Sequence, residues 1–501
     1  MNNRIYISVA VLFTVILPAT ISCGQGEVNE PNKPKPLSEV MLGPVPEQIF
    51  GAGRSLDSRH IAIVTAKDKK AVVVLDGKII PGEYDGVEGN IVFSPDSQRI
   101  AYIVKKSIRK QVVVDGKEGA EYDDIGKGTV VFSPDSKRAA YTARKGMKWL
   151  IVVDEQASEE YNGIMANSFF SPDSKRVIYA AEKTGKWQVF IDGKAGAEYS
   201  KIGSNLVFSP DSNHVAYAVH QGIGKLVVVD GNAGAEYDDI MEGTPIFSPD
   251  SKRVAYVGKK GMKWQVVVDG NAGPEYDSIG KGIPPVFSPD SKRIAYMARQ
   301  EYKWVVVIEG SDTTEHADVM ENSLIFSPDS KRVAYAAGKS GKWVVVINGQ
   351  AEPEYDNILK GTLIFSPNSK QLVYVAQEGI KCMVVVNGMA GGGYYRIGGT
   401  AIFSPDSQHI GYVAQKDSKW SIIVDGQSWL ECDRASNIAF SLDSKNAACV
   451  AMSGNKGFII INDKPVLTCD NVVCGPAPTD DGGFEAIFIR ENSFYRMFWK
   501  P

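Results

Sequence analysis

A five-residue tract, Phe-Ser-Pro-Asp-Ser, recurs along nearly the whole chain of 501 residues at an almost constant interval, and this interval constrains the fold more than any other feature. Intact copies begin at Phe93, Phe132, Phe170, Phe208, Phe247, Phe287, Phe326 and Phe403, and variants begin at Phe365 and Phe440. Successive copies lie 37 to 40 residues apart. Degenerate copies at Ser55–Ser58 and Pro478–Asp481 add one unit at each end, so the chain contains twelve copies of one supersecondary unit.

The sixth unit shows what one copy contains. A strand that ends at Phe247 is stopped by Ser248–Ser251, because Pro fixes φ in a β-turn and Asp or Ser hydrogen-bonds to the turn backbone. Two further strands are expected at Arg253–Val257 and Trp264–Val268, followed by an Asp-Gly pair that favours a tight hairpin turn. A short fourth strand is expected around Glu275–Asp277. Four strands in about 40 residues predict an all-β fold built from β-propeller blades.

The third strand of most units is apolar at nearly every position, which predicts that neighbouring blades cover both of its faces. A Trp opens this strand in six units, and its regular place in the repeat favours packing between blades over a ligand platform. These residues are Trp149, Trp187, Trp264, Trp304, Trp343 and Trp420.

The number of blades leaves the ring arrangement open. Propellers usually have four to eight blades, so twelve units favour two six-bladed rings, at residues 47–284 and 285–501, with one large ring, or one ring inserted into the other, as the alternatives. The Pro284-Pro285 pair and the longest interval between copies mark this boundary. The last unit stops after its third strand, Ser493–Trp499, and we expect the N-terminal Glu47–Phe50 to supply the missing fourth strand.

The run Phe-Ser-Pro-Asp-Ser-Lys-Arg-Val-Ala-Tyr resembles the WD40-like repeat of bacterial TolB-type propellers, and the resemblance covers residues from about 50 to 501. The repeats lack the Gly-His and Trp-Asp pairs of true WD40 repeats, so the hydrogen-bond network of those pairs is not expected. The resemblance implies a propeller fold and a protein partner in the bacterial envelope.

The N-terminus reads as an export signal. Arg4 precedes an apolar run from Ile5 to Leu17, which is too short for a membrane-spanning helix and is typical of a signal peptide, here residues 1–22. The stretch Thr20–Cys23 resembles the bacterial lipoprotein processing box, which implies a lipid on Cys23. The Pro-rich residues 23–46 are expected to form a flexible tether. We therefore expect an extracytoplasmic protein that is lipid-anchored in the cell envelope, at the outer membrane or facing the periplasm.

Residues with catalytic or metal-binding chemistry are mostly explained by the repeat. His60, His214 and His409 take the Arg position after the turn, and His316 takes a fourth-strand Tyr position. The hairpin Asp residues and the Glu-Tyr-Asp tracts are expected to form turns and edges rather than carboxylate rings. Five further cysteines lack metal-ligand spacing and sit mostly at core aromatic positions: Cys382, Cys432, Cys449, Cys469 and Cys474. The sequence leaves open whether two of the last four cysteines form a disulfide. We expect no metal, no cofactor and no enzymatic activity.

One face of the blades is expected to be basic. The loops between second and third strands carry 24 Lys or Arg against 5 Asp or Glu, whereas the whole chain carries 55 against 59. A basic face would attract an anionic partner, such as an acidic envelope polymer, lipid head groups or an acidic protein, and its attraction would weaken with salt. The other interpretation is that these residues keep the loops solvated and prevent edge pairing. The densest clusters, and our candidate anionic-partner surface, are Lys105, Lys106, Arg109, Lys110, Arg144, Lys145, Lys148, Lys259, Lys260 and Lys263.

These patterns support three hypotheses. The first is a non-enzymatic, membrane-tethered scaffold that binds an envelope protein or an anionic polymer; the export signal argues against nucleic acid. The second is a propeller with a small-molecule or glycan site at the central channel, including a hydrolase or lyase. The third is a passive spacer. The sequence does not indicate the oligomeric state.

Overall fold

The computed structural model describes residues 37–165, 170–310, 314–436 and 438–501. The predicted signal peptide, Cys23 and the tether up to residue 36 lie outside the described residues. Within those residues, the secondary structure consists of β-strands and one short 3-10 helix, Gly280–Gly282. The expected all-β class is therefore confirmed.

The sixth blade has the four strands that its sequence predicts. Its interrupted inner strand, β23 (Asp239–Ile240) and β24 (Ile246–Phe247), pairs with β25 (Val254–Lys260), which pairs with β26 (Lys263–Val268) and then with the outer β27 (Asn271–Tyr276). All these pairs are antiparallel. The turn begins directly after Phe247, as expected, because Pro249 cannot donate a hydrogen bond to a ladder.

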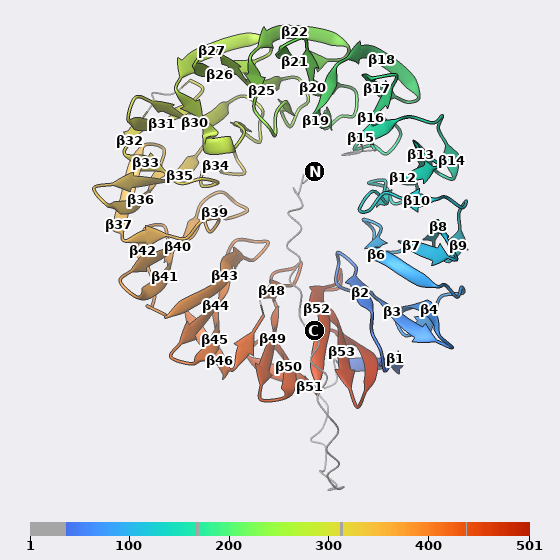
Figure 1. Cartoon of the computed structure of the whole chain (residues 1–501). Helices are drawn as coiled ribbons and strands as arrows, with labels where there is room; N and C mark the ends of the chain where they lie inside the picture. The colour runs from blue at the N-terminus through green and yellow to red at the C-terminus, as the bar shows by residue number, and fades with distance from the viewer. Residues whose placement is uncertain (1–36, 166–169, 311–313, 437) are drawn as a thin grey trace, which may run out of the picture. The chain divides into compact units, whose positions relative to one another are not determined.

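The strands of the described residues form twelve such sheets, arranged around a common axis (Figure 1). The first to fifth and the seventh to eleventh blades are β2 to β5 (51–79), β6 to β9 (86–118), β10 to β14 (124–157), β15 to β18 (163–199), β19 to β22 (201–237), β28 to β32 (278–316), β33 to β37 (318–355), β38 to β42 (357–390), β43 to β46 (396–432) and β47 to β51 (434–469). The twelfth blade combines β52 (Asn471–Pro478), β53 (Phe484–Arg490) and β54 (Ser493–Trp499) with the N-terminal β1 (Leu37–Pro44).

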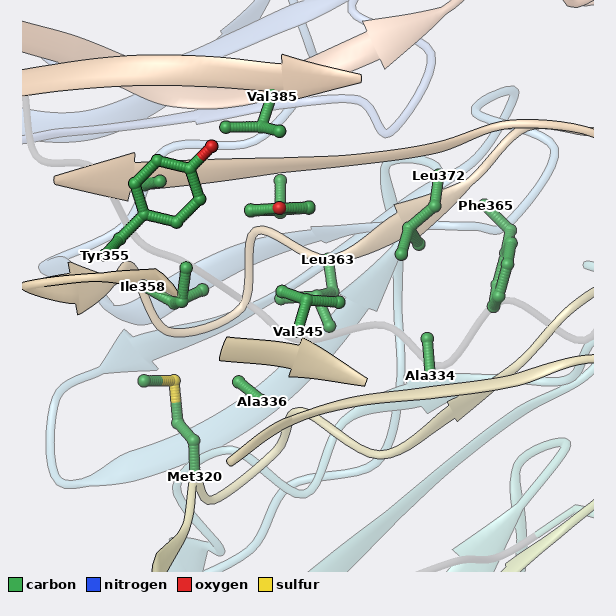
Figure 2. Close-up of a cluster of buried hydrophobic side chains, with 12 residues drawn as sticks. Met320, Ala334, Ala336, Val345, Tyr355, Ile358, Leu363, Phe365, Leu372 and Val385 are labelled. Atoms are coloured by element: carbon green, nitrogen blue, oxygen red, sulfur yellow. The ribbon is translucent and has the colours of Figure 1, made fainter. Parts of the chain in front are cut away.

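The hydrophobic core lies between the blades. In the cluster between the eighth and ninth blades, Val345 of β36 (Lys342–Ile347) packs with Leu372 of β40 (Leu372–Glu378) and with Tyr355 (Figure 2). The third strands are buried on both faces, as the apolar runs predict. Five of the six Trp residues pack, half-buried, against such clusters, which confirms packing between blades for Trp187, Trp264, Trp304, Trp343 and Trp420.

A tyrosine pair joins most neighbouring blades. Tyr276 at the end of one outer strand meets Tyr296 of the next blade edge-to-face, with ring centroids 6.2 Å apart. Cys432 and Cys449 replace both members of this pair between the tenth and eleventh blades, where both side chains are buried. Trp429 packs in the same cluster, at the position where the sixth blade has Gly273. The exchange of two large rings for two small thiols is thus accompanied by a larger side chain nearby.

The recurring tract acts as a staple between blades. Ser94 Oγ donates to Asp96 Oδ1 within its turn (2.6 Å), and the Asp96 amide donates to Ser136 Oγ of the next blade (2.9 Å). Arg99 donates to Asp115 Oδ2 of its own blade (2.7 Å) and to the Ser136 carbonyl of the next (2.9 Å). We call the side of the ring that carries these turns and the Asp-Gly hairpins the turn face.

The staples continue across the predicted boundary, so the two-ring expectation is corrected to one ring of twelve blades. Between the sixth and seventh blades, the Asp250 amide donates to Ser291 Oγ (2.8 Å), as the corresponding amides do at the junctions on either side. The last blade contacts the first, where Arg496 pairs with Asp76 at 2.7 Å. Pro284-Pro285 does not interrupt the series, because the interface between these blades buries the same Tyr pair and apolar strands as its neighbours.

The N-terminal strand closes the ring, but it is not the predicted one. β1 pairs with β54 in the sheet order β1-β54-β53-β52, from Leu37 opposite Trp499 to Pro44 opposite Ser493. The predicted Glu47–Phe50 instead forms part of the connection from this outer strand to β2, the inner strand of the first blade. The chain needs several residues to cross from the outer strand of the last blade to the inner strand of the first. The closing strand therefore lies earlier in the sequence than predicted, and the tether, which was expected to reach residue 46, ends at or before residue 36.

Candidate functional site

The side opposite the turn face carries the loops between second and third strands together with the blade-to-blade connections; we call it the hairpin face. On it, Lys263 pairs with Asp277 Oδ1 at 2.6 Å, and the Glu301 amide of the next hairpin donates to Asp277 Oδ2 at 2.6 Å. The hydrogen bond from Lys263 lowers the pKa of Asp277. One carboxylate therefore joins the hairpins of two consecutive blades.

This second staple recurs around the ring. Lys70 binds Asp85 (2.6 Å), which accepts the Ser107 amide (2.5 Å), and Lys456 binds Asp470 (2.9 Å), which accepts the Glu491 amide (2.8 Å). The Asp residues of the Glu-Tyr-Asp tracts thus link consecutive blades, a role that goes beyond the turns and edges expected from the sequence. The sequence count of charges omitted these acidic connections, although they lie on the same face as the basic loops.

The ten residues of the candidate anionic-partner surface all lie on or beside this face, and most are paired. Lys106 binds Glu118, Arg109 binds Asp123, Lys110 binds Glu88 and Asp124, Arg144 approaches Asp124, Lys145 approaches Glu160, Lys148 binds Asn162 and Lys263 binds Asp277. Lys259 lies over the Trp264 ring. Among the described residues, only Lys105 and Lys260 of this set are exposed without such a contact. The free positive charge is therefore smaller than the loops alone indicate, and anion binding stays a prediction.

The hairpin face also carries large apolar side chains that the sequence interpretation missed. They occupy the second residue of the two-residue turn in six hairpins, and each is at least 76% exposed: Ile108, Met147, Ile223, Met262, Tyr302 and Ile380. The first turn residue has φ near +60°, as at Gly261, which is why Gly precedes the tip in four hairpins. In the sequence, these exposed residues could have been recognised as apolar residues that directly follow the first turn residue of each hairpin.

The fold does not require these apolar tips. Ser418 and Asn455 hold the same turn position in the tenth and eleventh blades, where the hairpins pair in the same register. An exposed Ile or Met gains nothing from burial within the ring, whereas exposed apolar side chains that recur at one position are typical of a contact surface. We refer to the six residues as the apolar tips.

Four of the five histidines have the structural roles that their repeat positions predict. His60, His214 and His409 replace the staple Arg, and Nδ1 of each lies 2.6 to 2.7 Å from the Asp-Gly hairpin carboxylate. His316 Nε2 lies 3.0 Å from the hydroxyl of Tyr335. Over the described ranges, no group of three His, Cys, Asp or Glu side chains is arranged to hold a metal ion.

The described cysteines are free thiols in the core or at its edge. Cys432, Cys449, Cys469 and Cys474 are buried and Cys382 is half-buried. Burial raises the pKa of Cys469 to about 12, and that of Cys474 to about 12, so these thiols are poor nucleophiles at neutral pH.

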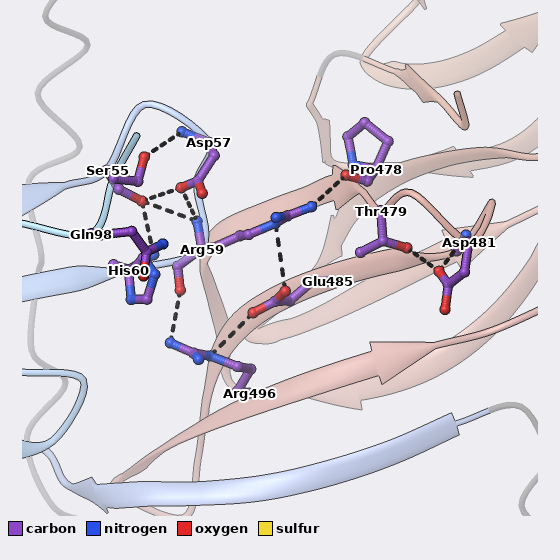
Figure 3. A network of polar contacts seen from close by, with 12 residues as sticks. Ser55, Asp57, Arg59, His60, Gln98, Pro478, Thr479, Asp481, Glu485 and Arg496 are labelled. Carbon is purple, nitrogen blue, oxygen red and sulfur yellow. Dashed lines mark hydrogen bonds and ion pairs between the residues drawn. The ribbon is translucent and has the colours of Figure 1, made fainter. Parts of the chain in front are cut away.

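The interface between the last and first blades contains a network of charged side chains (Figure 3). Glu485, only 7% exposed, lies 3.6 Å from Arg59 and 3.3 Å from Arg496, and Arg59 also donates to the Pro478 carbonyl (2.9 Å). Burial raises the pKa of Glu485 although both Arg charges act against this. At the positions of Glu485 and Arg496 the second blade has Ala101 and Val112, so charges replace an apolar contact here.

A shallow cavity of about 400 Å³ opens on the hairpin face beside the inner strands of the fifth to seventh blades. Trp264, Ser278 and the ion-paired Lys225 and Asp239 line it. Its mixture of one aromatic ring and several polar groups can accommodate a small polar ligand.

In the part of the chain that the structure describes, no helix has the length and hydrophobicity needed to traverse a lipid bilayer. Twelve small antiparallel sheets around one axis define the protein as a β-propeller. No protein-family model and no curated protein matches the chain.

Among solved structures, the chain is similar to a eukaryotic initiation factor, with 14% identity, 66% of this chain and 93% of that chain covered, and a TM-score of 0.34. It is similar to TolB from Acinetobacter baumannii, with 20% identity, coverages of 44% and 63%, and a TM-score of 0.21. The GH74 enzyme of Niastella koreensis gives 14% identity, coverages of 91% and 84%, and a TM-score of 0.24. At these identities and TM-scores the similarities assign no function to this chain.

Proposed function

We propose that this protein is a non-enzymatic interaction scaffold of the bacterial envelope, tethered through a lipid on Cys23, that binds a macromolecular partner through its hairpin face. The observation that carries the proposal is the set of six apolar tips at a turn position whose identity the fold leaves free. The polar side chains that recur in the blades, in contrast, are largely engaged in staples between blades.

The basic loops add electrostatic attraction to this proposal but are not its main support. Most of the ten candidate residues neutralise a carboxylate of the same face, while Lys105 and Lys260 remain exposed. Electrostatic attraction then steers an anionic partner toward the tips without supplying most of the affinity.

The test is cross-linking and capture from envelope extract with wild type beside a variant that carries Met147→Ser, Ile223→Ser and Met262→Ser. Serine already occupies this turn position at residue 418, so the variant keeps the hairpin geometry. We expect wild type to enrich a macromolecular component, protein or lipid, that the variant loses. Equal enrichment by both proteins, or by neither, contradicts the scaffold proposal.

A second candidate function, ligand binding next to the central channel, is favoured by the cavity beside Trp264. Titration with neutral and acidic oligosaccharides while the Trp fluorescence is followed tests this candidate. A saturable change that Trp264→Phe abolishes supports it, whereas an unchanged signal argues against it.

A further inference from the structure

Six exposed apolar side chains share one face, but each stands on a hairpin of its own. They belong to the second, third, fifth, sixth, seventh and ninth blades, so they extend over more than half of the ring. Because second-to-third hairpins leave every blade on the same side, the tips point in one general direction. A broad surface can contact all of them together, whereas a pocket or groove on a small partner contacts only neighbours.

Basic side chains flank the tips closely. The hairpins of Ile108, Met147 and Met262 carry Lys or Arg on both sides of the turn and no acidic residue, and Lys105 and Lys260 stay exposed there. Apolar side chains that project beyond a border of Lys and Arg suit an anionic lipid surface, since the apolar groups enter the headgroup region and the cations meet phosphate. We propose that the hairpin face docks on a membrane that contains anionic lipid; this inference deepens the proposed scaffold function and depends on it.

The distribution of tips also predicts which part of the ring makes contact. The hairpins of the tenth and eleventh blades carry Ser418 and Asn455 at the tip, and those of the first and twelfth carry Lys69 and Asn492. These four consecutive blades form a polar arc beside the closing strand β1. The arc from the second to the ninth blade therefore makes the lipid contact through its six apolar tips, and the polar arc stays hydrated. The fourth and eighth blades, which carry Gly185 and Gly341 at the tip position, add no apolar side chain to this contact.

The attachment of the N-terminus is compatible with this docking. Leu37 lies at the turn-face end of β54, because Pro44 at the other end of β1 is opposite Ser493, next to the hairpin. The 13 residues between Cys23 and Leu37 can span about 45 Å when extended, and a seven-residue strand about 23 Å. The chain is thus long enough for a lipid on Cys23 and the hairpin face to meet the same membrane.

Vesicle sedimentation tests the proposal with the full chain carrying Cys23→Ser, so that no acyl chain contributes. The probes are vesicles of phosphatidylcholine alone and vesicles that also contain phosphatidylglycerol. We expect binding to the anionic vesicles that weakens with salt, and a loss of roughly tenfold or more in partitioning for the Met147→Ser, Ile223→Ser, Met262→Ser variant. Both proteins share the same N-terminal segment, so any binding by that segment is common to them.

A local probe separates tip insertion from general adsorption. A polarity-sensitive dye on Met262→Cys should shift to the blue on anionic vesicles, whereas the same dye on Lys137→Cys, on the turn face, should not. Equal sedimentation of wild type and variant, or a shift at residue 137 without one at residue 262, overturns the lipid assignment. If a protein is then captured through the tips in the absence of vesicle binding, the scaffold proposal survives and only its partner changes.

Discussion

Leu37, the first residue that the structure describes, lies directly opposite Trp499 in the antiparallel pair of β1 and β54. The two ends of the chain therefore build one blade together, and Glu39 of β1 adds an ion pair with Arg490. A ring of repeats needs such a closure, because an open array leaves an apolar blade face exposed at each end.

Removal of residues 37–44 should open this closure. β54 would lose its outer partner, and Arg490 would lose the carboxylate of Glu39, so we expect the free energy of unfolding to fall by about 3 kcal/mol or more. Chemical denaturation measures the loss, and removal of residues 24–36 alone is the matched control. A stable, monomeric variant without residues 37–44 would show that β1 is dispensable.

The charged interface between the last and first blades should show strong coupling. Glu485→Ala leaves Arg59 without a carboxylate and leaves Arg496 with Asp76 alone, so it should cost about 1–3 kcal/mol. Adding Arg496→Val restores the Ala and Val pair of the second blade, so the double variant should be less destabilised than the sum of the single ones, by about 1 kcal/mol or more. A double-mutant cycle from denaturant unfolding measures this coupling, and strict additivity would contradict it.

Two substitutions distinguish the stabilising contacts of Asp277 on the hairpin face from a general effect of removing a surface charge. Asp277→Ala removes the acceptor of Lys263 and of the Glu301 amide and should lower the free energy of unfolding measurably. Lys260→Ala, in the same blade but without an ion pair, should change it by less than about 0.5 kcal/mol. Thermal unfolding of both variants checks the difference, and similar values for the two would refute the staple.

The turn-face aspartates should make stability depend on acid. The hydrogen bond from Ser133 and the Lys137 amide lower the pKa of Asp135, and similar bonds from Thr479 and Lys500 lower the pKa of Asp481 to about 2. A carboxyl group with a lowered folded pKa stabilises the fold above its unfolded value near 3.8, and this stabilisation is lost as pH falls through the folded value. The melting temperature should therefore drop between about pH 4 and pH 2.

Asp135→Asn provides the matched control for this acid effect. Asn368 holds the same position in the ninth blade and accepts the same bonds, from Ser366 Oγ at 2.8 Å and the Lys370 amide at 3.0 Å. The variant should keep the turn but reduce the acid sensitivity. An unchanged pH profile would mean that these carboxyl groups do not control acid unfolding.

Much of the local structure followed from short sequence patterns. Turn residues such as Pro249, with the apolar run up to Val268, predicted the strands of the sixth blade to within a few residues. The repeat register also assigned His60 and Cys449 to structural positions. These predictions succeed because turn chemistry and burial within one blade depend on residues close in sequence.

The recurring tract by itself determined that the protein is a propeller of twelve blades, because each copy contains its own turns and strands. Only the tertiary structure decided the single ring, the use of Leu37–Pro44 as the closing strand, and the pairing of basic hairpins with acidic connections. The physical reason is that closure and charge compensation depend on groups in different blades, or at opposite ends of the chain, whose approach no local pattern encodes. The exposure of Met262 and the other apolar tips likewise became visible only once every neighbour was in place.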